Sequence, residues 1–449
     1  MPNVKGTRDL LPSESVIWAR VEETARRVFS LYGYGEIRTP VLEHTELFVR
    51  TVGESTDIVG KEMYTFEDRK GRSLTLRPES TAAVARAFVD HRLGEQPLPV
   101  KLFYMGPHFR YERPQKGRYR EFHQIGAELL GDPGPASDAE VIRMLVGFLE
   151  ELGFEDLTVL LHTVGDQETR EAYRAALVEF FAPLAEQLSS ESRKRLERNP
   201  LRILDTKDSA ERELLIDAPK LEDSLSAGSR EHFAGVRSAL DRLGVKYRVD
   251  PGLVRGLDYY TLTVFEIVSE GLGAQNAIVG GGRYDRLLAD LGGPDLPAIG
   301  FAIGLDRLVE SLPAAFRDRC TQAPAVRLIA IDPVPKLAAM ELGEELRARG
   351  VAAVVDFGND RMKAALKRAH RSGARYVLLL GEDELAKNAV TCRDLNAGEQ
   401  SLVPRSEIVG LLHNRLRNQI KGQIKGQIEG QIEGQPAGQP GRQRGEGEA

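Results

Sequence analysis

The sequence is poor in the features by which several protein classes are recognised. It has only two cysteines, Cys320 and Cys392, far apart in its 449 residues. Two thiols cannot build a thiolate metal site or a disulfide framework, which predicts a reducing compartment, the cytoplasm. The histidines show no zinc-ligand spacing such as HExxH, so no metal site is assigned. No run of about 18 apolar residues and no apolar signal core occur, so we expect no membrane contact.

Length and charge set two further limits. A chain of 449 residues is too long for one ordinary hydrophobic core, so two or three domains are expected. The formal net charge is -6, which is not that of a general polyanion-binding protein. Any surface that binds nucleic acid must therefore be a local basic patch.

Residues 107–128 carry such a patch, in the pattern of a β-hairpin. The segment 113–117 (RPQKG) is typical of a turn, and both flanks alternate as strands do. Because each guanidinium offers a fork of donors that matches phosphate oxygens, this face suits a polyphosphate. A solvated basic hairpin and an RNA-binding patch without catalysis remain the alternatives. The basic residues of the segment are Arg110, Arg113, Lys116, Arg118 and Arg120.

Hydrophobic spacing predicts the elements around the hairpin. Helices are expected over 14–31, 79–89 and 137–152, a hairpin over 63–76 and a strand over 157–164. An extended segment that contains Pro40 is expected at a sheet margin, a break or a subunit interface. Residues 166–243 are charged, rich in helical patterns and nearly free of strand signals, which predicts a helical insertion.

The remainder predicts a second domain and a tail. From Val326 the pattern is β-α-β-α-β, which indicates a small α/β domain over 325–415 after a first domain over 1–320. The linker is expected near 318–324. Residues 416–449 have low complexity and a repeated glycine that opposes helix formation, so we expect a disordered tail.

Three more segments carry chemistry-bearing residues, although each alone has an ordinary explanation. Residues 253–260 read LVRGLDYY, 280–285 read GGGRYD, and 300–307 read GFAIGLDR. Alone, Arg255 and Arg307 would be surface charges. The triple glycine suits either a close backbone approach to a ligand or a sharp turn between strands. No GxGxxG or GxxxxGK[ST] motif is present.

Taken together, these segments resemble the histidyl-tRNA synthetases, a family of class II aminoacyl-tRNA synthetases. The hairpin resembles class II motif 2, GFAIGLDRL resembles motif 3, and the region around Pro40 resembles motif 1. The segments LVRGLDYY and GGGRYD resemble two that are peculiar to the histidine enzymes, and KGTRDLLP and RPEST (77–81) match as well. The resemblance extends from residue 4 to about residue 415.

The resemblance implies a fold and a reaction. The fold would be α+β: an antiparallel-sheet class II catalytic domain with a helical insertion, followed by an α/β anticodon-binding domain. The reaction would join L-histidine to tRNA(His) through a histidyl-adenylate, with ATP as substrate, Mg²⁺ accompanying ATP and a homodimer as the active form. Attack of a carboxylate on a phosphate needs positive charge at the α-phosphate, which the resemblance assigns to Arg110 and Arg255. Arg255 would stand where other class II enzymes hold a metal ion.

Residue by residue, the resemblance implies three binding sites. The ATP-binding residues would be Arg110, Glu112, Arg118, Phe122 and Arg307. The histidine-binding residues would be Glu79, Thr81, Arg110, Gln124, Glu128, Arg255, Tyr259, Tyr260 and Tyr284. Among these, Glu128 and Tyr260 would read the imidazole, whose one donor and one acceptor suit a carboxylate and a phenol. Gln115 and Arg120 would meet the acceptor end of the tRNA.

The main alternative is the regulatory subunit of ATP phosphoribosyltransferase, a non-catalytic relative. It typically lacks an anticodon domain and has an eroded motif 2, whereas both are present here. A synthetase for another amino acid would lack LVRGLDYY and GGGRYD, and the class I motifs HIGH and KMSKS are absent. One departure from the family is Ser80, which stands where glycine is common.

Overall fold

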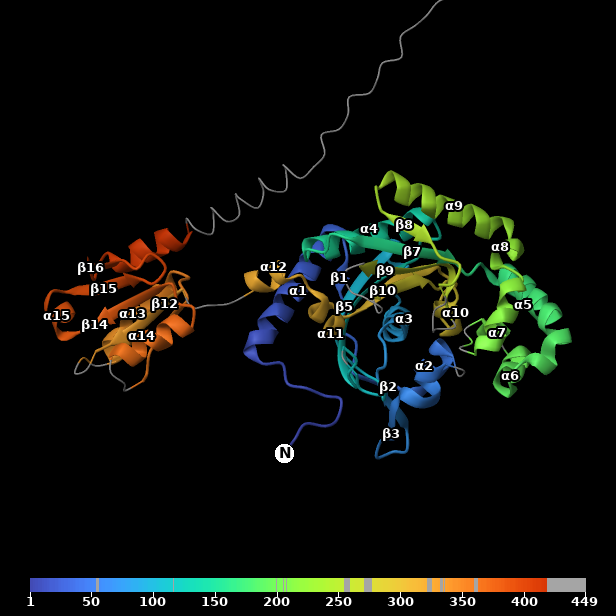
Figure 1. The fold of residues 1–449 in the computed structure, drawn as a ribbon, viewed down its shortest axis with the longest axis horizontal. Helices are drawn as coiled ribbons and strands as arrows, with labels where there is room; N and C mark the ends of the chain where they lie inside the picture. The colour runs from blue at the N-terminus through green and yellow to red at the C-terminus, as the bar shows by residue number, and fades with distance from the viewer. Residues whose placement is uncertain are drawn as a thin grey trace, which may run out of the picture. The chain divides into compact units, whose positions relative to one another are not determined.

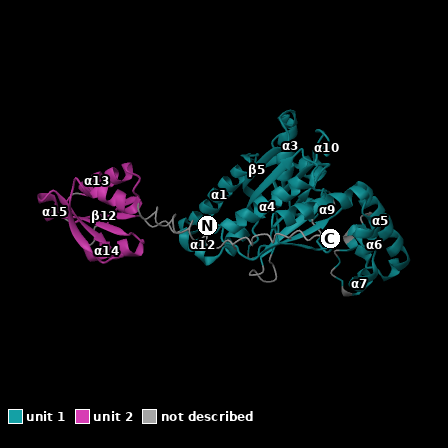
Figure 2. Cartoon of the chain, turned by 90° about the horizontal axis from the view of Figure 1, so that it is seen from above, with its two compact units in different colours: residues 1–321 teal, residues 322–449 magenta. Residues whose placement is uncertain are grey.

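The computed structural model describes residues 1–53, 56–115, 117–198, 200–204, 206, 208–253, 259–269, 277–320, 325–331, 334, 336–358 and 362–417. The chain divides into two compact units, residues 1–321 and 322–449 (Figure 2). Among the described helices, none combines the length and hydropathy that a membrane span needs. Of the tail expected over 416–449, residues 416 and 417 are helical, and those from 418 onward lie outside the described part.

An eight-stranded sheet forms the centre of the first unit (Figure 1). Neighbouring strands are antiparallel except at the two edges, where β1 runs parallel to β5 and β8 runs parallel to β7. The edge strand β1 ends before Pro40, so the expected edge and break are both found. In sheet order the strands are β1 (Gly35–Glu36), β5 (Val100–Phe109), β6 (Glu121–Leu130), β11 (Ala298–Gly304), β10 (Ala277–Arg283), β9 (Thr261–Ser269), β7 (Leu157–Thr163) and β8 (Tyr247–Val249).

The basic segment is a hairpin, as the sequence predicts, and its strands are longer than the motif. Strands β5 and β6 pair from Val100 opposite Leu130 to Phe109 opposite Glu121. Beyond them, Gln115 and Arg118 form an isolated bridge across the turn. The turn of the hairpin therefore extends beyond the ends of the paired strands β5 and β6.

The main core lies on one face of this sheet. Helices α1 (Pro12–Leu31) and α4 (Pro135–Glu151) pack there, together with α11 (Leu305–Ser311). Phe29 of α1 stands at the centre, with ring centroids 5.5 to 5.9 Å from those of Phe103, Phe148 and Phe301. These three rings come from β5, α4 and β11, so one aromatic cluster fastens the helical layer to the sheet.

The opposite face of the sheet is covered near the hairpin by α3 (Thr81–Asp90) and α10 (Leu287–Asp290). Helix α3 begins two residues later than the sequence predicts, because Glu79 lies before it and caps it. The Glu79 carboxylate accepts hydrogen bonds from the backbone N–H groups of Thr81 (2.7 Å) and Ala82 (3.0 Å). Nearby elements are β2 (Leu42–His44), β3 (Tyr64–Glu67), β4 (Ser73–Leu76), α2 (Thr45–Val52), a π-turn η1 (Ile58–Glu62) and η2 (Leu93–Glu95). The predicted hairpin over 63–76 is thus found as β3 and β4.

Residues 166–243 fold into the expected helices, most of which gather at one end of the first unit (Figure 1). Tyr173, Leu177 and Phe181 form a small core of their own with Leu188 and Ile203. The last helix, α9, packs along α4. The elements are α5 (Gln167–Phe181), η3 (Ala182–Gln187), α6 (Ser190–Arg198), η4 (Pro200–Ile203), α7 (Ser209–Leu214), η5 (Leu215–Asp217), α8 (Leu221–Ser224) and α9 (Ala227–Arg242).

The second unit holds a five-stranded sheet in the order β13-β12-β14-β15-β16. The predicted β-α-β-α-β pattern is present, but β15 and β16 follow it as an antiparallel pair that the sequence pattern did not reveal. Residues 408–417 are helical. The elements are β12 (Val326–Ala330), α13 (Lys336–Ala348), β13 (Ala353–Val355), α14 (Met362–Arg371), β14 (Tyr376–Leu380), α15 (Glu382–Ala386), β15 (Ala389–Asp394) and β16 (Gln400–Pro404), after α12 (Ala314–Arg319) of the first unit.

The triple glycine lies inside strand β10, so the sharp turn that the sequence left open is wrong. A Cβ at Gly281 would collide with the backbone oxygen of Gly300, and it would lie 2.8 Å from the Cβ of Phe301. A Cβ at Gly282 would lie 2.7 Å from the Tyr260 ring. Glycine is required here because the neighbouring strand and a tyrosine ring approach the backbone of β10.

We expect Gly281→Ala to lower the free energy of unfolding by about 1–3 kcal/mol, because a methyl group there must push β10 and β11 apart. Thermal unfolding followed by circular dichroism measures the loss. Gly35→Ala is the control, since a Cβ at Gly35 in the edge strand β1 meets nothing within 4 Å. Equal melting temperatures for the two variants would contradict the prediction.

Candidate functional site

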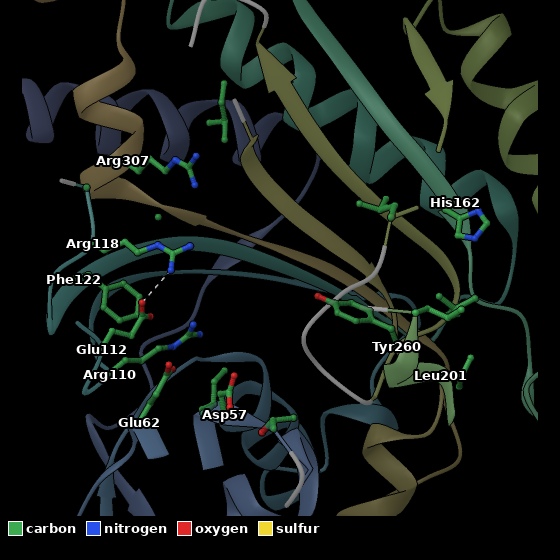
Figure 3. Close-up of a pocket in the computed structure, with 18 of the residues that line it drawn as sticks. Asp57, Glu62, Arg110, Glu112, Arg118, Phe122, His162, Leu201, Tyr260 and Arg307 are labelled. Atoms are coloured by element: carbon green, nitrogen blue, oxygen red, sulfur yellow. Dashed lines mark hydrogen bonds and ion pairs between the residues drawn. The ribbon is translucent and has the colours of Figure 1, made fainter. Parts of the chain in front are cut away.

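A cavity of about 830 Å³ opens at the end of the hairpin in the first unit. The hairpin and its turn supply Arg110, Glu112, Gly117, Arg118, Tyr119 and Phe122. The inserted helices supply Arg170, Tyr173, Arg195, Leu201, Leu204 and Leu221. In Figure 3, three arginines lie on one side of this space, whereas Tyr260, His162 and Leu201 lie on the other. The cavity is therefore shared between the sheet and the insertion.

Positive charge converges on the sheet side of the cavity. The Nε of Arg110 donates to the Pro78 carbonyl (2.9 Å), and its guanidinium lies 5.4 Å from the centroid of the Phe122 ring. Arg307 stands in the first turn of α11, where burial and then the charge of Arg118 lower the pKa of its guanidinium. Cations held this close to each other create a site for an anion with several charges.

Carboxylates line the same cavity beside the arginines. Arg118 contacts Glu112 with its Nη1 3.4 Å from the carboxylate Oε2. Burial, followed by the charge of Glu112, raises the pKa of Glu62. A cation bound between Glu62 and Glu112 would relieve this repulsion.

The other described residues predicted to bind histidine form a buried cluster on the α3 side of the sheet. Thr81 donates from Oγ1 to Glu128 Oε1 (2.8 Å), and the Tyr284 hydroxyl donates to Glu128 Oε2. Glu79, Thr81, Glu128 and Tyr284 are each at most 8% exposed. The cavity and this cluster share Tyr260, which lines the cavity and lies against Tyr259 with 4.9 Å between ring centroids.

Burial dominates the electrostatics of the cluster. Burial raises the pKa of Glu128 to about 8, although its hydrogen bonds from Tyr284 and Thr81 act in the opposite direction. Burial also raises the pKa of Glu79. Gln124 lies on the same face of β6 as Glu128, and within the described chain its Oε1 has no hydrogen-bond partner. The cluster is therefore rich in polar groups that a bound polar ligand would satisfy.

Behind the cluster, a buried ion pair fixes the strand end that bears Tyr284. Arg283 and Asp138 are both fully buried, and the Arg283 Nε lies 3.1 Å from Asp138 Oδ1. His232 of the inserted helix α9 contacts the other oxygen of Asp138 at 2.8 Å. Burial alone would raise the pKa of Asp138, but His232 and Arg283 outweigh burial and lower it. The insertion is thus bonded to the same group that holds β10 in place.

The two residues proposed to meet RNA differ in their exposure to solvent. Gln115 is exposed at the hairpin turn. Arg120 is partly buried, donates from Nε to the Glu112 carbonyl (3.2 Å) and lies 3.8 Å from the centroid of Tyr111. Arg120 therefore braces the hairpin itself.

Arg255, expected at the α-phosphate, lies outside the described residues.

Several site residues were not found by sequence reasoning. Asp306 accepts from the backbone N–H of His123 (2.9 Å) and from Arg8 (3.1 Å), so it ties motif 3 to the start of β6. Arg170 of α5 donates to the Tyr260 carbonyl (3.2 Å). Tyr104 is buried, and burial followed by the charges of Glu128 and Glu79 raises its pKa. Arg8 and Asp306 belong to quoted motifs, whereas nothing local marked Arg170 or Tyr104.

Comparison with known proteins gives one family for nearly the whole chain. The family model described as "Histidyl-tRNA synthetase" matches residues 6–308, and the one described as "Anticodon binding domain" matches 326–415. A histidine–tRNA ligase of Lysinibacillus sphaericus is 48% identical over 412 residues, covering 91% of this chain and 98% of that protein. One of Thermosynechococcus vestitus is 48% identical over 408 residues, covering 90% and 94%. The crystal structure of apo S. aureus histidyl-tRNA synthetase matches with a TM-score of 0.79 and 33% identity, covering 92% and 100%.

We expect Arg283→Met to lower the free energy of unfolding by about 3–5 kcal/mol, because Asp138 would remain buried without its main cation. Urea denaturation measures the loss. Arg143→Met on the same helix as Asp138 is the control: its pair with Glu150 is partly exposed and should cost less than about 1 kcal/mol. The double variant Arg283→Met, Asp138→Leu should regain part of the loss. A single variant as stable as the control would contradict this account.

The raised pKa of Glu128 predicts a pH dependence of stability. In the folded chain this carboxyl keeps its proton up to about pH 8, whereas its ordinary pKa is 4.5. The folded state therefore binds more protons between these two values, and the contribution of Glu128 to the free energy of unfolding falls as the pH rises through this window. Glu128→Gln removes this contribution. Urea denaturation of both proteins at several pH values tests it, and identical pH profiles would contradict the assignment.

Proposed function

Because the chain belongs to the histidyl-tRNA synthetase family, we propose that the cavity at the end of the hairpin binds ATP and that the buried cluster binds histidine. As a histidine–tRNA ligase, the chain charges tRNA with histidine. In the first step the carboxylate of histidine attacks the α-phosphorus of ATP, which forms histidyl-adenylate and releases diphosphate. In the second step the ribose of tRNA(His) takes the histidyl group, and AMP leaves.

The arrangement of arginines supports the ATP site. Arg110 is braced by the Pro78 carbonyl and faces the Phe122 ring, so a base stacked on Phe122 would have its α-phosphate near this guanidinium. Arg118 and Arg307 line the same side of the cavity, where they would bind the outer phosphates. Fixed cations lower the barrier because they stabilise the charge that develops at the phosphorus. We assign the same role to Arg255.

Strand β6 carries the observation on which the proposal rests. Phe122, Gln124 and Glu128 stand on one face of this strand, because side chains two residues apart in a strand point the same way. Phe122 borders the cavity, whereas Glu128 belongs to the buried cluster. One face of one strand therefore runs from the ATP site into the histidine site, and the two substrates would meet end to end.

The buried cluster suits histidine by its donors and acceptors. Glu79, Thr81 and Gln124 would hold the α-ammonium, while Glu128 and Tyr260 would read the imidazole nitrogens. Tyr259 and Tyr284 would line the pocket, their ring centroids 5.6 Å apart. An apolar amino acid of similar size would leave these buried groups unpaired, which is a strong basis for rejection.

We propose that Mg²⁺ accompanies ATP. Within the described ranges, no group of three or more His, Cys, Asp or Glu side chains could hold a metal ion. Mg²⁺ is commonly held by one or two carboxylates together with substrate phosphates, and the repulsion between Glu62 and Glu112 fits that kind of site. These two residues would hold the ion, which would neutralise phosphate charge.

The remaining proposals concern partners. Gln115 at the exposed turn would meet the acceptor end of tRNA(His), and Arg120 would do so from the partly buried position in which it braces the hairpin. The inserted helices would clamp the stem behind it. The second unit matches an anticodon-binding domain. We propose a homodimer in the cytoplasm. The regulatory subunit of ATP phosphoribosyltransferase is disfavoured because the anticodon-binding unit and the arginines of motifs 2 and 3 are both present.

Pyrophosphate exchange into ATP with each of the twenty amino acids tests the function. We expect exchange with histidine alone, and exchange with none would support the regulatory alternative. Arg255→Ala should abolish exchange while ATP and histidine still bind, because its proposed role is charge stabilisation during attack. Near-normal exchange in that variant would remove Arg255 from the mechanism.

Two variants should separate the two substrate sites. Arg307→Ala should raise the KM for ATP roughly 10- to 100-fold with little change in the KM for histidine, since it loses a charge-assisted contact to phosphate. Tyr260→Phe should raise the KM for histidine and leave that for ATP nearly unchanged. Arg319→Ala, on the neighbouring helix α12, is the control. Equal effects of each variant on both constants would contradict the assignment.

A further inference from the structure

Ser80 and His108 form a buried pair on the border between the two proposed substrate sites. Ser80 immediately precedes α3, between Glu79 and Thr81, and His108 lies on strand β5. Both side chains are fully buried, and the Ser80 Oγ lies 2.7 Å from the His108 Nε2. Neither residue of this pair is among the site residues that the family resemblance implies.

The surroundings of His108 fix the direction of this hydrogen bond. Its Nδ1 lies 3.0 Å from the backbone oxygen of Gly106, which can only accept, so Nδ1 carries the hydrogen. Burial, followed by the charges of Arg77 and Arg110, lowers the pKa of His108 well below its usual value, and the ring is neutral. Nε2 is therefore an acceptor, and the Ser80 hydroxyl donates to it.

The Ser80 hydroxyl makes no capping hydrogen bond to helix α3, which follows it. A serine before a helix ordinarily accepts from the backbone of the first turn, but here the Glu79 carboxylate does so. Its bond to His108 instead joins the start of α3 to β5. This segment is fastened to the hairpin a second time, two residues earlier, by the bond from Arg110 Nε to the Pro78 carbonyl.

His108 in turn supports the ATP side. Its ring lies against Phe122, with 5.8 Å between centroids and 31° between the planes. Phe122 is the proposed stacking surface for adenine, and Arg110 faces the same ring at 5.4 Å. The pair thus connects the segment that presents Glu79 and Thr81 to the strand and ring that would hold ATP.

We propose that Ser80 is a positioning residue: its hydrogen bond to His108 sets the spacing between the histidine-binding segment 79–81 and the ATP-binding wall formed by Arg110 and Phe122. This inference rests on the proposed function of these two sites. Glycine at this position could not make the bond, so the link between the two proposed substrate sites depends on the serine hydroxyl.

Ser80→Ala and Ser80→Gly test the link in pyrophosphate exchange. We expect the KM values for histidine and for ATP both to rise roughly fivefold, with a smaller change in kcat, since one buried hydrogen bond is lost. Ser192→Ala is the matched control: Ser192 is also buried and donates to Glu211 Oε2 (2.9 Å), but within the inserted helices. It should lower the melting temperature and leave both KM values unchanged.

A double-mutant cycle shows whether Ser80 acts through His108. His108→Asn keeps a nitrogen near the Nδ1 position but cannot reach Ser80, so adding Ser80→Ala should change the KM values by less than about twofold. Full additivity of the two substitutions would overturn the link. Ser80 variants whose melting temperature falls while both KM values stay as in the unmodified chain would likewise overturn it.

NMR of protein with ¹⁵N-labelled histidine detects the hydrogen bond between Ser80 and His108 directly. We expect His108, assigned by its loss in His108→Asn, to be the neutral Nδ1–H tautomer, with an Nε2 resonance that shifts in Ser80→Ala. An Nε2–H tautomer would overturn the proposed direction. If the unmodified chain shows no histidine-dependent exchange, the proposed function fails as well, whereas normal exchange with unchanged constants in Ser80→Ala refutes the positioning role alone.

Discussion

The alternation of side chains along β6 is the constraint on which the site depends. Ile125, Ala127 and Leu129 point into the core beneath α1 and α4, so the strand cannot slip by one residue without burying polar groups there. The same alternation places Gln124 and Glu128 on the opposite face, toward α3. Packing of the hydrophobic core therefore sets the register of the side chains on the α3 side of β6, and through β6 it sets that of the hairpin turn.

Burying these polar side chains is possible because the surrounding backbone leaves room for them and supplies partners. A Cβ at Gly300 would collide with the Glu128 carboxylate, so glycine in β11 is what allows that carboxylate to lie over the neighbouring strand. Arg283 and Asp138 fix the end of β10 from behind, where neither meets solvent. The site is thus held by close backbone approach and one buried ion pair.

Sequence reasoning succeeded where the signal was local and failed where it depended on distant contacts. The hairpin over 107–128 could be predicted because a turn lies between two alternating flanks. Helix α1 could be predicted from its apolar spacing. The conformation of the triple glycine could not be assigned from the sequence. Glycine is required at Gly281 because Phe265 and Gly300 on other strands approach its backbone. The bond from His232 to Asp138 spans 94 residues, and no local pattern encodes it. The residues named from motifs could therefore be listed from the sequence, whereas the contacts that hold them in place could not.

The inserted helices take part in the site as well as covering it. Arg170 of α5 donates to the backbone of Tyr260, and His232 of α9 contacts the Asp138 carboxylate that holds Arg283. The first bond reaches the segment 253–260 directly, and the second reaches the segment 280–285 through the Asp138 carboxylate that holds Arg283. Since both bonds are partly buried and specific in direction, a shift of the insertion must strain one of them or move the segment it holds. The insertion is therefore bonded both to Tyr260 and to the ion pair that precedes Tyr284.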